Sequence, residues 1–221
     1  MTKELHIYLF RHGQTYFNRD GIFTGWLDSK LTSLGIKQAQ IIAKKLKDKK
    51  FDIAFFTKLT RSKQTLKEVL KYHSNIQVIE DNRMIERNYG KLNGVSHEKF
   101  IRKMGKQGYD LLKEGDAIEN LSPRDRDSVE EFLGKNEYNA IHRGYDVAVP
   151  GGESFADVEK RVKSFIEDLK KFMKKNKVSV AISAHGNSIR LFRKIMEKSS
   201  KEEAIKWFIP YDKVFEYDVK V

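Results

Sequence analysis

The sequence contains no cysteine, and this absence excludes several kinds of chemistry. Disulfide bonds, thiolate nucleophiles and cysteine-based metal sites all require this residue. The sequence also has no run approaching the roughly 20 apolar residues that span a bilayer, and no apolar N-terminal stretch of signal-peptide length. We therefore expect a cytoplasmic protein without a membrane partner, in which any covalent catalysis uses another side chain.

Internal repeats, low-complexity tracts and coiled-coil heptads are lacking as well, so nothing indicates a repetitive architecture. The 221 residues are 39% hydrophobic, which is enough for one sizeable core. We therefore expect a single domain over residues 1–221.

The balance of charge is strongly basic, with 43 Lys and Arg against 31 Asp and Glu and a formal net charge of +12. Such a charge favours anionic partners, and a non-catalytic anion-binding or nucleic-acid-binding module is one reading of it. The lysine runs at 44–50 and 170–177 fall in expected helices, where a solvated face explains them. Basic motifs interleaved with aromatic residues, which read nucleic acid, are lacking. Charge alone does not choose among nucleic acid, an anionic membrane surface and a phosphorylated metabolite. The candidate site residues lead us to expect a small phosphorylated metabolite and not nucleic acid.

The sequence does contain two His-Gly dipeptides, each directly after a short apolar run. His12 follows the run at 5–10, and His185 follows the run at 178–183. Both runs are typical of buried strands. In an open parallel sheet, ligands bind outside the carboxyl ends of the strands. We therefore expect the two imidazoles to converge on one ligand.

Expected strands and helices alternate along most of the chain. Strands are expected at 5–10, 53–56, 76–80 and 178–183. Helices are expected after an N-cap at Thr32, at 60–72, at 154–175, and from Asn187 or Ser188 to Ile195. This alternation predicts an α/β fold, a three-layer α/β/α sandwich around a mostly parallel sheet.

Residues 98–149 interrupt this alternation. Their glycines and many acidic residues predict loops with some short helices, for example near 127–133. An insertion of this length is typical of a lid or a binding loop, or of a disordered excursion. We interpret it as a cover over the site.

His12 is the candidate nucleophile. A neutral imidazole nitrogen can attack phosphorus and hold the phosphoryl group as phosphohistidine. The transition state spreads charge over three equatorial oxygens, which fixed cationic donors stabilise. Arg11 is adjacent, and Arg61 begins the helix after the second strand. A protonated His185 and the amide of Asn18 would add further donors.

Glu86 is the candidate general acid and base, because it follows the third strand and so lies at the same edge of the sheet. Phosphate oxygens beside a carboxyl favour its protonated form, which can donate to a leaving alkoxide. The alternative is a surface salt bridge between Glu86 and Arg83 or Arg87.

These residues resemble the histidine phosphatase, or phosphoglycerate mutase-like, superfamily. The motifs that carry the resemblance are LFRHGQT at 9–15, Phe17-Asn18, Arg61, Glu86 and SAHGNS at 183–188. FTGW at 23–26, LTSLG at 31–35 and ERNYGKLNG at 86–94 are similar to the cofactor-dependent phosphoglycerate mutases. The resemblance covers most of the chain apart from residues 98–141.

The resemblance implies a phosphoglycerate mutase-like fold and the interconversion of 3- and 2-phosphoglycerate in glycolysis and gluconeogenesis, without metal. His12 would be phosphorylated, with 2,3-bisphosphoglycerate as the phosphoryl primer. The phosphoryl group would be held by Arg11, Asn18, Arg61, His185 and the amide of Gly186. The glycerate end would face Thr24, Gly25, Tyr89 and Asn187. Because related mutases are often oligomers, the resemblance also implies a homodimer or homotetramer.

Two positions depart from the mutase pattern. His97 stands where the mutases have a substrate-binding lysine, and of their Arg-Arg pair only Arg143 is matched well. Both are still candidate substrate ligands. The sequence also ends soon after Asp218, where many mutases continue into a tail over the site. Easier access of water would let hydrolysis compete with transfer. The alternative function is therefore a histidine-type phosphatase acting on a small phosphorylated metabolite.

Overall fold

The computed structural model describes residues 4–115, 118 and 121–220. The elements used below are, in chain order, β1 (Glu4–Arg11), α1 (Tyr16–Arg19), α2 (Ser33–Leu46), β2 (Ile53–Phe56), α3 (Thr60–Leu70), β3 (Gln77–Glu80), the 3-10 turns η1 (Asn82–Met84) and η2 (Gly90–Leu92), α4 (His97–Glu114), α5 (Pro123–Arg143), α6 (Phe155–Asn176), β4 (Val180–Ala184), α7 (Gly186–Glu197), α8 (Lys201–Ala204) and β5 (Val214–Lys220).

The five strands form one sheet in the order β3-β2-β4-β1-β5. The pairs β3-β2, β2-β4 and β4-β1 are parallel, and β5 lies antiparallel to β1 at the edge. The mostly parallel sheet is as predicted. Strand β5 was not predicted, because only Phe215 and Val219 of its seven residues are buried and its apolar signal is weak.

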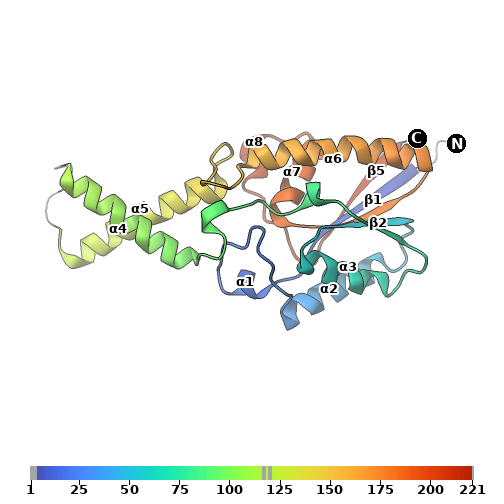
Figure 1. The fold of residues 1–221 in the computed structure, drawn as a ribbon, viewed down its shortest axis with the longest axis horizontal. Helices are drawn as coiled ribbons and strands as arrows, with labels where there is room; N and C mark the ends of the chain where they lie inside the picture. Colours follow the sequence, from blue (N-terminus) through green and yellow to red (C-terminus); the bar gives the residue numbers. More distant parts are fainter. Residues whose placement is uncertain (1–3, 116–117, 119–120, 221) are drawn as a thin grey trace.

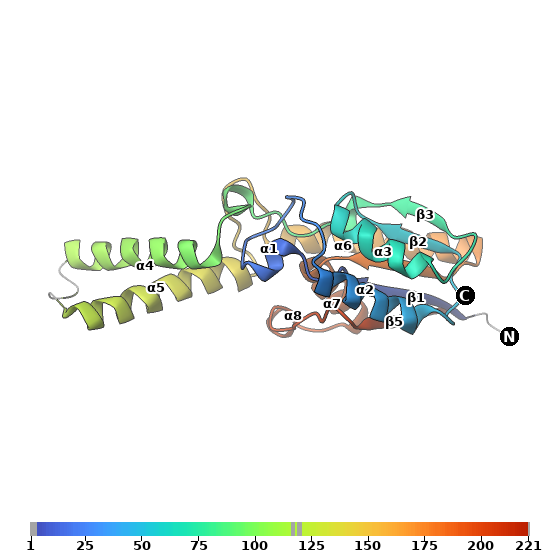
Figure 2. The same cartoon turned by 90° about the horizontal axis from the view of Figure 1, so that it is seen from below.

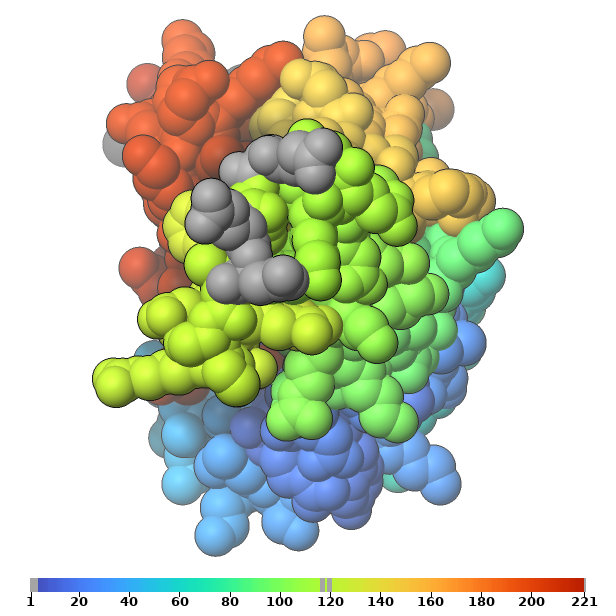
Figure 3. All heavy atoms as spheres, turned by 90° about the vertical axis from the view of Figure 1, so that its left-hand side faces the viewer, coloured from blue at the N-terminus to red at the C-terminus, as the bar shows by residue number. Residues whose placement is uncertain are grey.

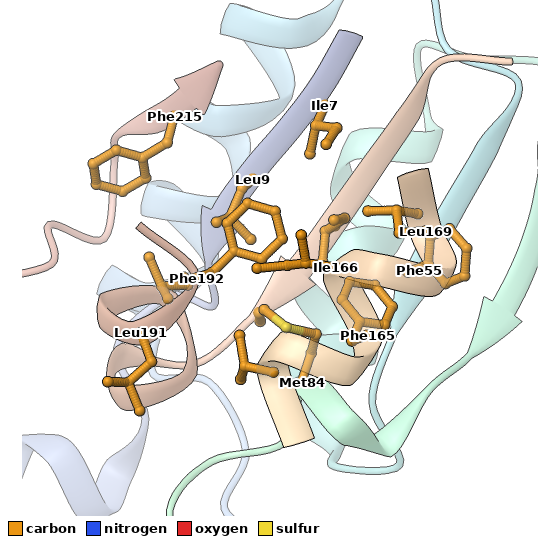
Figure 4. Close-up of a cluster of buried hydrophobic side chains, with 14 of the residues drawn as sticks. Ile7, Leu9, Phe55, Met84, Phe165, Ile166, Leu169, Leu191, Phe192 and Phe215 are labelled. Atoms are coloured by element: carbon orange, nitrogen blue, oxygen red, sulfur yellow. The ribbon is translucent and has the colours of Figure 1, made fainter. Parts of the chain in front are cut away.

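Helices cover both faces of the sheet, which gives the predicted three layers (Figures 1 and 2). Successive side chains of a strand point to opposite faces, and β1 shows this clearly. Ile7 and Leu9 pack in the core beneath α6 and α7, whereas Tyr8 and Phe10 pack beneath α2 and α3. Figure 4 shows the first of these clusters, where residues of α6 and α7 meet the sheet. Two buried faces explain why β1 is almost continuously apolar.

Residues 98–149 contain two long helices in place of the short ones expected. α4 has 18 residues and α5 has 21, and together they form a hairpin that projects from the domain (Figures 1 and 2). In Figure 3 the hairpin lies in front and is seen from its end. Residues 116–117 and 119–120 of the expected insertion lie outside the described residues. A Cβ on Gly105 would lie 2.0 Å from the carbonyl oxygen of Glu130, and one on Gly134 would lie 2.1 Å from that of Ile101. These glycines therefore let two helices pack backbone to backbone, although they indicate loops in the sequence.

Candidate active site

The two His-Gly dipeptides lie side by side at the carboxyl edge of the sheet. β1 and β4 are parallel neighbours whose register pairs Arg11 with Ala184. The backbone N–H of His12 extends this pairing by donating to the carbonyl of Ala184 at 3.1 Å. The ring centroids of His12 and His185 are consequently 5.0 Å apart. Two loops 173 residues apart in the sequence thus deliver adjacent imidazoles.

The environment of His12 defines its tautomer. Nδ1 lies 2.8 Å from the carbonyl oxygen of Gly13. A carbonyl only accepts, so Nδ1 carries the proton and Nε2 keeps a free lone pair. Burial, together with Arg61 and Arg11, holds the pKa of His12 well below its usual value. His12 is therefore a neutral imidazole at neutral pH, the form that can act as a nucleophile.

His185 lies behind His12 and is fully buried. Its Nε2 is 2.7 Å from the hydroxyl of Thr57, which follows β2. Its Nδ1 has no hydrogen-bond partner among the described residues. Burial, with smaller contributions from Arg61 and His12, lowers the pKa of His185 well below 6.5. The ring is thus neutral in the free protein, and the protonated state considered from the sequence is disfavoured by desolvation.

Arg61 connects the phosphate-binding edge to the FTGW segment. It lies in the first turn of α3 and is 1% exposed. Nη1 donates to the carbonyl of Leu27 at 2.9 Å, and Nη2 donates to that of Gly25 at 2.8 Å. Gly25 has a φ of +47°, and a Cβ there would lie 1.9 Å from Oδ1 of Asn93. Only glycine therefore lets this loop place its carbonyl on Arg61.

Arg11 is held by the segment that precedes β5. Nη1 donates to the carbonyl of Ile209 at 2.9 Å, and the guanidinium lies 4.0 Å from the ring centroid of Tyr211. Nε of Arg11 is buried and has no partner among the described residues. The side chain is thus fixed in place but retains an unused donor.

Glu86 is 9% exposed and is fixed to the helix that follows His185. Its Oε1 accepts from the backbone N–H of Arg87 at 2.7 Å and from that of Asn187 at 3.2 Å. Both bonds use Oε1, so Oε2 is the oxygen that can exchange a proton with a ligand. Arg83 pairs with Asp81, and the described residues contain no salt bridge to Glu86. The alternative of a surface salt bridge is therefore wrong.

Two further arginines line the pocket. Arg143, at the end of α5, donates from Nη1 to the carbonyl of Ile205 at 2.8 Å. Arg190, on α7, donates from Nε to the carbonyl of Trp207 at 2.8 Å and from Nη1 to the side-chain oxygen of Asn187. Burial and the neighbouring Arg143 lower the pKa of Arg190 to about 10, so it is still charged at neutral pH.

Neutral acceptors hold all four pocket arginines in place. In the described part of the chain, none of Arg11, Arg61, Arg143 and Arg190 forms an ion pair with a carboxylate. A carbonyl oxygen orients a guanidinium without cancelling its formal charge. Glu86 is the one acidic side chain among the described residues that line the pocket. The pocket is therefore strongly cationic and suited to an anionic ligand.

A wall of rings lines another part of the pocket, at the base of the α4–α5 hairpin. The ring of His97 lies edge-on to Phe23 at 4.3 Å between centroids, and His142 stacks on Tyr138 at 5.0 Å. Burial lowers the pKa of His97, and burial with the nearby Arg143 lowers that of His142 to about 3. Both imidazoles are neutral at neutral pH, so this wall contributes no positive charge.

The pocket has a volume of about 280 Å³. Its lining residues are Arg11, His12, Phe17, Asn18, Ile22, Phe23, Thr24, Gly25, Arg61, Glu86, Tyr89, His97, Tyr138, His142, Arg143, Gly186, Asn187, Arg190, Phe208 and Tyr211. The hairpin reaches the pocket only with its base, while its far end projects away from the domain (Figure 1).

Comparison with known proteins assigns the family. The sequence profile of the histidine phosphatase superfamily (branch 1) matches residues 7–133 and 118–218. The chain belongs to the histidine phosphatase superfamily. A relative from Rhizobium rhizogenes, described as a 2,3-bisphosphoglycerate-dependent phosphoglycerate mutase, is 33% identical over 203 residues, which cover 89% of this chain and 82% of the relative.

Solved structures of superfamily proteins show the same fold. The α-ribazole phosphatase of Shigella flexneri superimposes with a TM-score of 0.72 at 21% identity, covering 98% of this chain and 95% of the other. A phosphoglycerate mutase of Bacillus anthracis gives a TM-score of 0.69 at 19% identity, covering 98% and 88%. The fold is thus shared by members named as mutases and as phosphatases.

Of the thirteen site residues expected from the sequence, twelve line the pocket of this superfamily member. His185 is the exception, since it lies behind His12. Sequence reasoning missed His142, Arg190 and Tyr211 as lining residues. Tyr138 was missed too, although it lies four residues before His142 on α5 and so shares its face. Nothing in the local sequence marks Tyr211, which reaches the site only through the fold.

Two further absences concern the described residues only. They contain no group of three or more His, Cys, Asp or Glu side chains arranged to hold a metal ion. They also contain no helix that is both long and apolar enough to cross a membrane.

Proposed function

We propose that this chain is a 2,3-bisphosphoglycerate-dependent phosphoglycerate mutase, which interconverts 3- and 2-phosphoglycerate through a phosphohistidine on His12. The observation that carries the proposal is the neutral imidazole of His12, with Nδ1 bound to Gly13 and Nε2 available, in a pocket whose arginines form no ion pair with any carboxylate of the described residues. The mutase relatives at about 33% identity support the choice of substrate.

The donors of the site fit a bisphosphate primer. Three buried side-chain polar atoms lack a partner among the described residues, and two of them, Nε of Arg11 and Nδ1 of His185, belong to this site. An unpaired buried donor is costly. Phosphoryl oxygens would accept from Nε of Arg11, and from Nδ1 of His185 in the tautomer that carries the proton there. Arg11, Arg61 and His185 would hold the phosphoryl group next to His12. When bound, the bisphosphate supplies the phosphoryl group that loads His12.

Each side chain of the site has its own role in the phosphoryl transfer. Nε2 of His12 attacks phosphorus while the proton stays on Nδ1, where the Gly13 carbonyl stabilises the positive charge that develops on the ring. Arg11 and Arg61 stabilise the charge on the equatorial oxygens. Oε2 of Glu86 gives a proton to the departing alkoxide and removes one from the hydroxyl that later attacks the phosphohistidine.

The partner is accordingly a small phosphorylated metabolite, because the cationic groups converge inside a pocket of about 280 Å³ rather than over a broad surface. Nucleic acid and membranes are not part of this proposal. Assembly as a homodimer or homotetramer is still the expectation from the family resemblance.

A phosphatase acting on a similar metabolite is the second candidate, and His97 favours it. In the position assigned to a mutase lysine, this chain has a neutral, half-buried ring packed against Phe23. A weaker hold on the acceptor would let water reach the phosphohistidine first. The shared chemistry ends at the phosphoenzyme, and the two functions differ only in the acceptor.

One experiment separates the two candidates. The protein is incubated with 2,3-bisphosphoglycerate and 3-phosphoglycerate, and acid-labile phosphoenzyme, 2-phosphoglycerate and released phosphate are measured together. We expect conversion to exceed phosphate release and both to disappear in His12→Ala, while His73→Asn, far from the pocket, behaves as wild type. Rapid phosphate release without conversion would replace the mutase with the phosphatase.

A further inference from the structure

One short backbone segment holds three of the four pocket arginines. Residues 205–211, hereafter the strap, lie between α8 and β5. Three alternate carbonyls of this segment accept a hydrogen bond, from Arg143 at Ile205, from Arg190 at Trp207 and from Arg11 at Ile209. The three arginines come from α5, α7 and β1, which are distant in the sequence. Their relative positions are therefore set jointly by the strap.

The strap is anchored by side chains that do not line the pocket. Trp207 packs on the guanidinium of Arg193, with 4.1 Å between the charge centre and the ring centroid. Ile209 is 1% exposed and belongs to the core beneath α6 and α7. These contacts fix the strap, so its carbonyls present fixed acceptors to the arginines.

Arg190 has the clearest unused capacity for a ligand. It lines the pocket but is only 8% exposed, so its position is well defined. Nε is bound to the strap and Nη1 to Asn187, which leaves Nη2 as the nitrogen without a hydrogen bond to any of the described residues. Arg143 is close enough to lower the pKa of Arg190, and no carboxylate in the described part of the chain pairs with either side chain. Two adjacent guanidinium groups without a counter-ion are typical of a site for an anion.

We propose that the strap positions Arg190, together with Arg143, to bind a second anionic group of the substrate, and that Arg190 determines the preference for phosphate esters carrying such a group. This inference rests on the proposed function only for the placement of the ester phosphate next to His12. It assigns the second anion to Arg190 of α7 and Arg143 of α5 rather than to His97, whose ring is neutral.

The test compares two ligands that differ only in the second anion. 3-Phosphoglycerate has a carboxylate where glycerol 3-phosphate has a hydroxymethyl group. Their dissociation constants are measured calorimetrically in a His12→Ala background, which prevents turnover. We expect 3-phosphoglycerate to bind more tightly than glycerol 3-phosphate. Arg190→Gln should raise the dissociation constant of 3-phosphoglycerate at least about tenfold, because a charge-assisted hydrogen bond is lost. The dissociation constant of glycerol 3-phosphate should change by less than about threefold in the same variant.

Conservative variants separate charge from position. Arg190→Lys retains the charge but replaces the three spaced nitrogens of the guanidinium group with one, so it should recover only part of the affinity for 3-phosphoglycerate. Trp207→Ala should loosen the strap from outside the pocket and weaken the binding of 3-phosphoglycerate more than that of glycerol 3-phosphate. Trp207→Phe should retain the preference for 3-phosphoglycerate. Arg83→Gln removes a surface charge outside the pocket and serves as the control.

Several outcomes would overturn the inference. These are equal binding of the two ligands to the parent, no binding of either, an equal loss for both in Arg190→Gln, or full recovery in Arg190→Lys. An unchanged ligand ratio in Trp207→Ala would refute the role of the strap. None of these measurements requires turnover, so a protein that lacks mutase activity but keeps the ligand preference would refute only the proposed function.

Discussion

The ring centroids of His12 and His185 lie 5.0 Å apart, at an interplanar angle of 57°. One ring is fixed by a backbone carbonyl and the other by the hydroxyl of Thr57. Their roles differ because of these partners. His12 has a defined tautomer with a free Nε2, whereas His185 has a free Nδ1 and a hydroxyl that can either donate or accept.

Removing the hydroxyl of Thr57 tests this arrangement. Thr57→Val retains the shape of the side chain but leaves Nε2 of His185 buried without its partner, which costs about 1–3 kcal/mol of stability. We expect phosphoenzyme formation to slow about tenfold, because His185 loses its orientation towards the phosphoryl group. Rapid-quench measurement of labelled phosphoenzyme reports the rate.

The stability-matched control is Ser122→Ala, which removes the N-cap of α5 far from the pocket and costs about 1 kcal/mol. Equal slowing in both variants would attribute the effect to stability alone.

Glu86→Gln tests the proton transfer. The amide oxygen can still accept from the backbone N–H groups of Arg87 and Asn187, so the geometry of the pocket is retained. The amide cannot serve as a general acid, and we expect kcat to fall by about 10²–10⁴-fold. Inhibition by vanadate should persist, since the phosphate-binding donors are intact. Wild-type turnover in this variant would remove Glu86 from the mechanism.

We predict that Arg87 stabilises the fold and has no role in catalysis. It is fully buried, and its guanidinium donates to the carbonyls of Ile141, Val147 and Glu153, which joins the end of α5 to the segment before α6. Arg87→Met leaves these carbonyls without a donor, and we expect a loss of about 2–4 kcal/mol.

Urea denaturation measures this loss, and hydrogen exchange of residues 140–147 should accelerate. Arg87→Lys, which can retain a single donor contact, should lose less. Unchanged stability in Arg87→Met would show that relief of the buried charge offsets the lost bonds.

The buried histidines predict that acid destabilises the protein. The pKa of His142 is lowered to about 3 from the usual 6.5, and those of His12 and His185 are also lowered. Between about pH 6.5 and pH 3 the unfolded chain therefore binds more protons than the folded protein. The free energy of unfolding therefore decreases as the pH is lowered through this window, by up to about 1.4 kcal/mol per pH unit for each such group.

His142→Phe retains the stacked ring but removes one titrating group. Urea denaturation at pH 6.5 and 5.0 should show that the free energy of unfolding depends less steeply on pH in the variant. The difference in slope corresponds to about one proton. Carboxylates contribute equally to both proteins, so the difference in slope isolates His142. Identical slopes would mean that His142 is protonated in the folded protein.

Local patterns in the sequence were enough to predict the fold class and most of the residues that line the pocket. Apolar runs that end in His-Gly, and an arginine in the first turn after the next strand, are local patterns. A parallel sheet brings the carboxyl ends of its strands to one edge, so His12, Arg61, Glu86 and Gly186 had to meet. The predicted N-cap at Thr32 is also confirmed, because its side chain accepts a hydrogen bond from the N–H of Gly35. This contact spans only three residues, so a local pattern predicts it.

The details that control the chemistry depend on contacts between segments that are distant in the sequence. The tautomer of His12 depends on how its ring turns towards Gly13, and the neutral state of His185 depends on complete burial. Gly105 and Gly134 indicate loops locally, yet they let α4 and α5 pack closely. Arg11 and its acceptor Ile209 are 198 residues apart. Such contacts join distant segments, and no local pattern encodes them, because they form only once the sheet and both helical layers are in place.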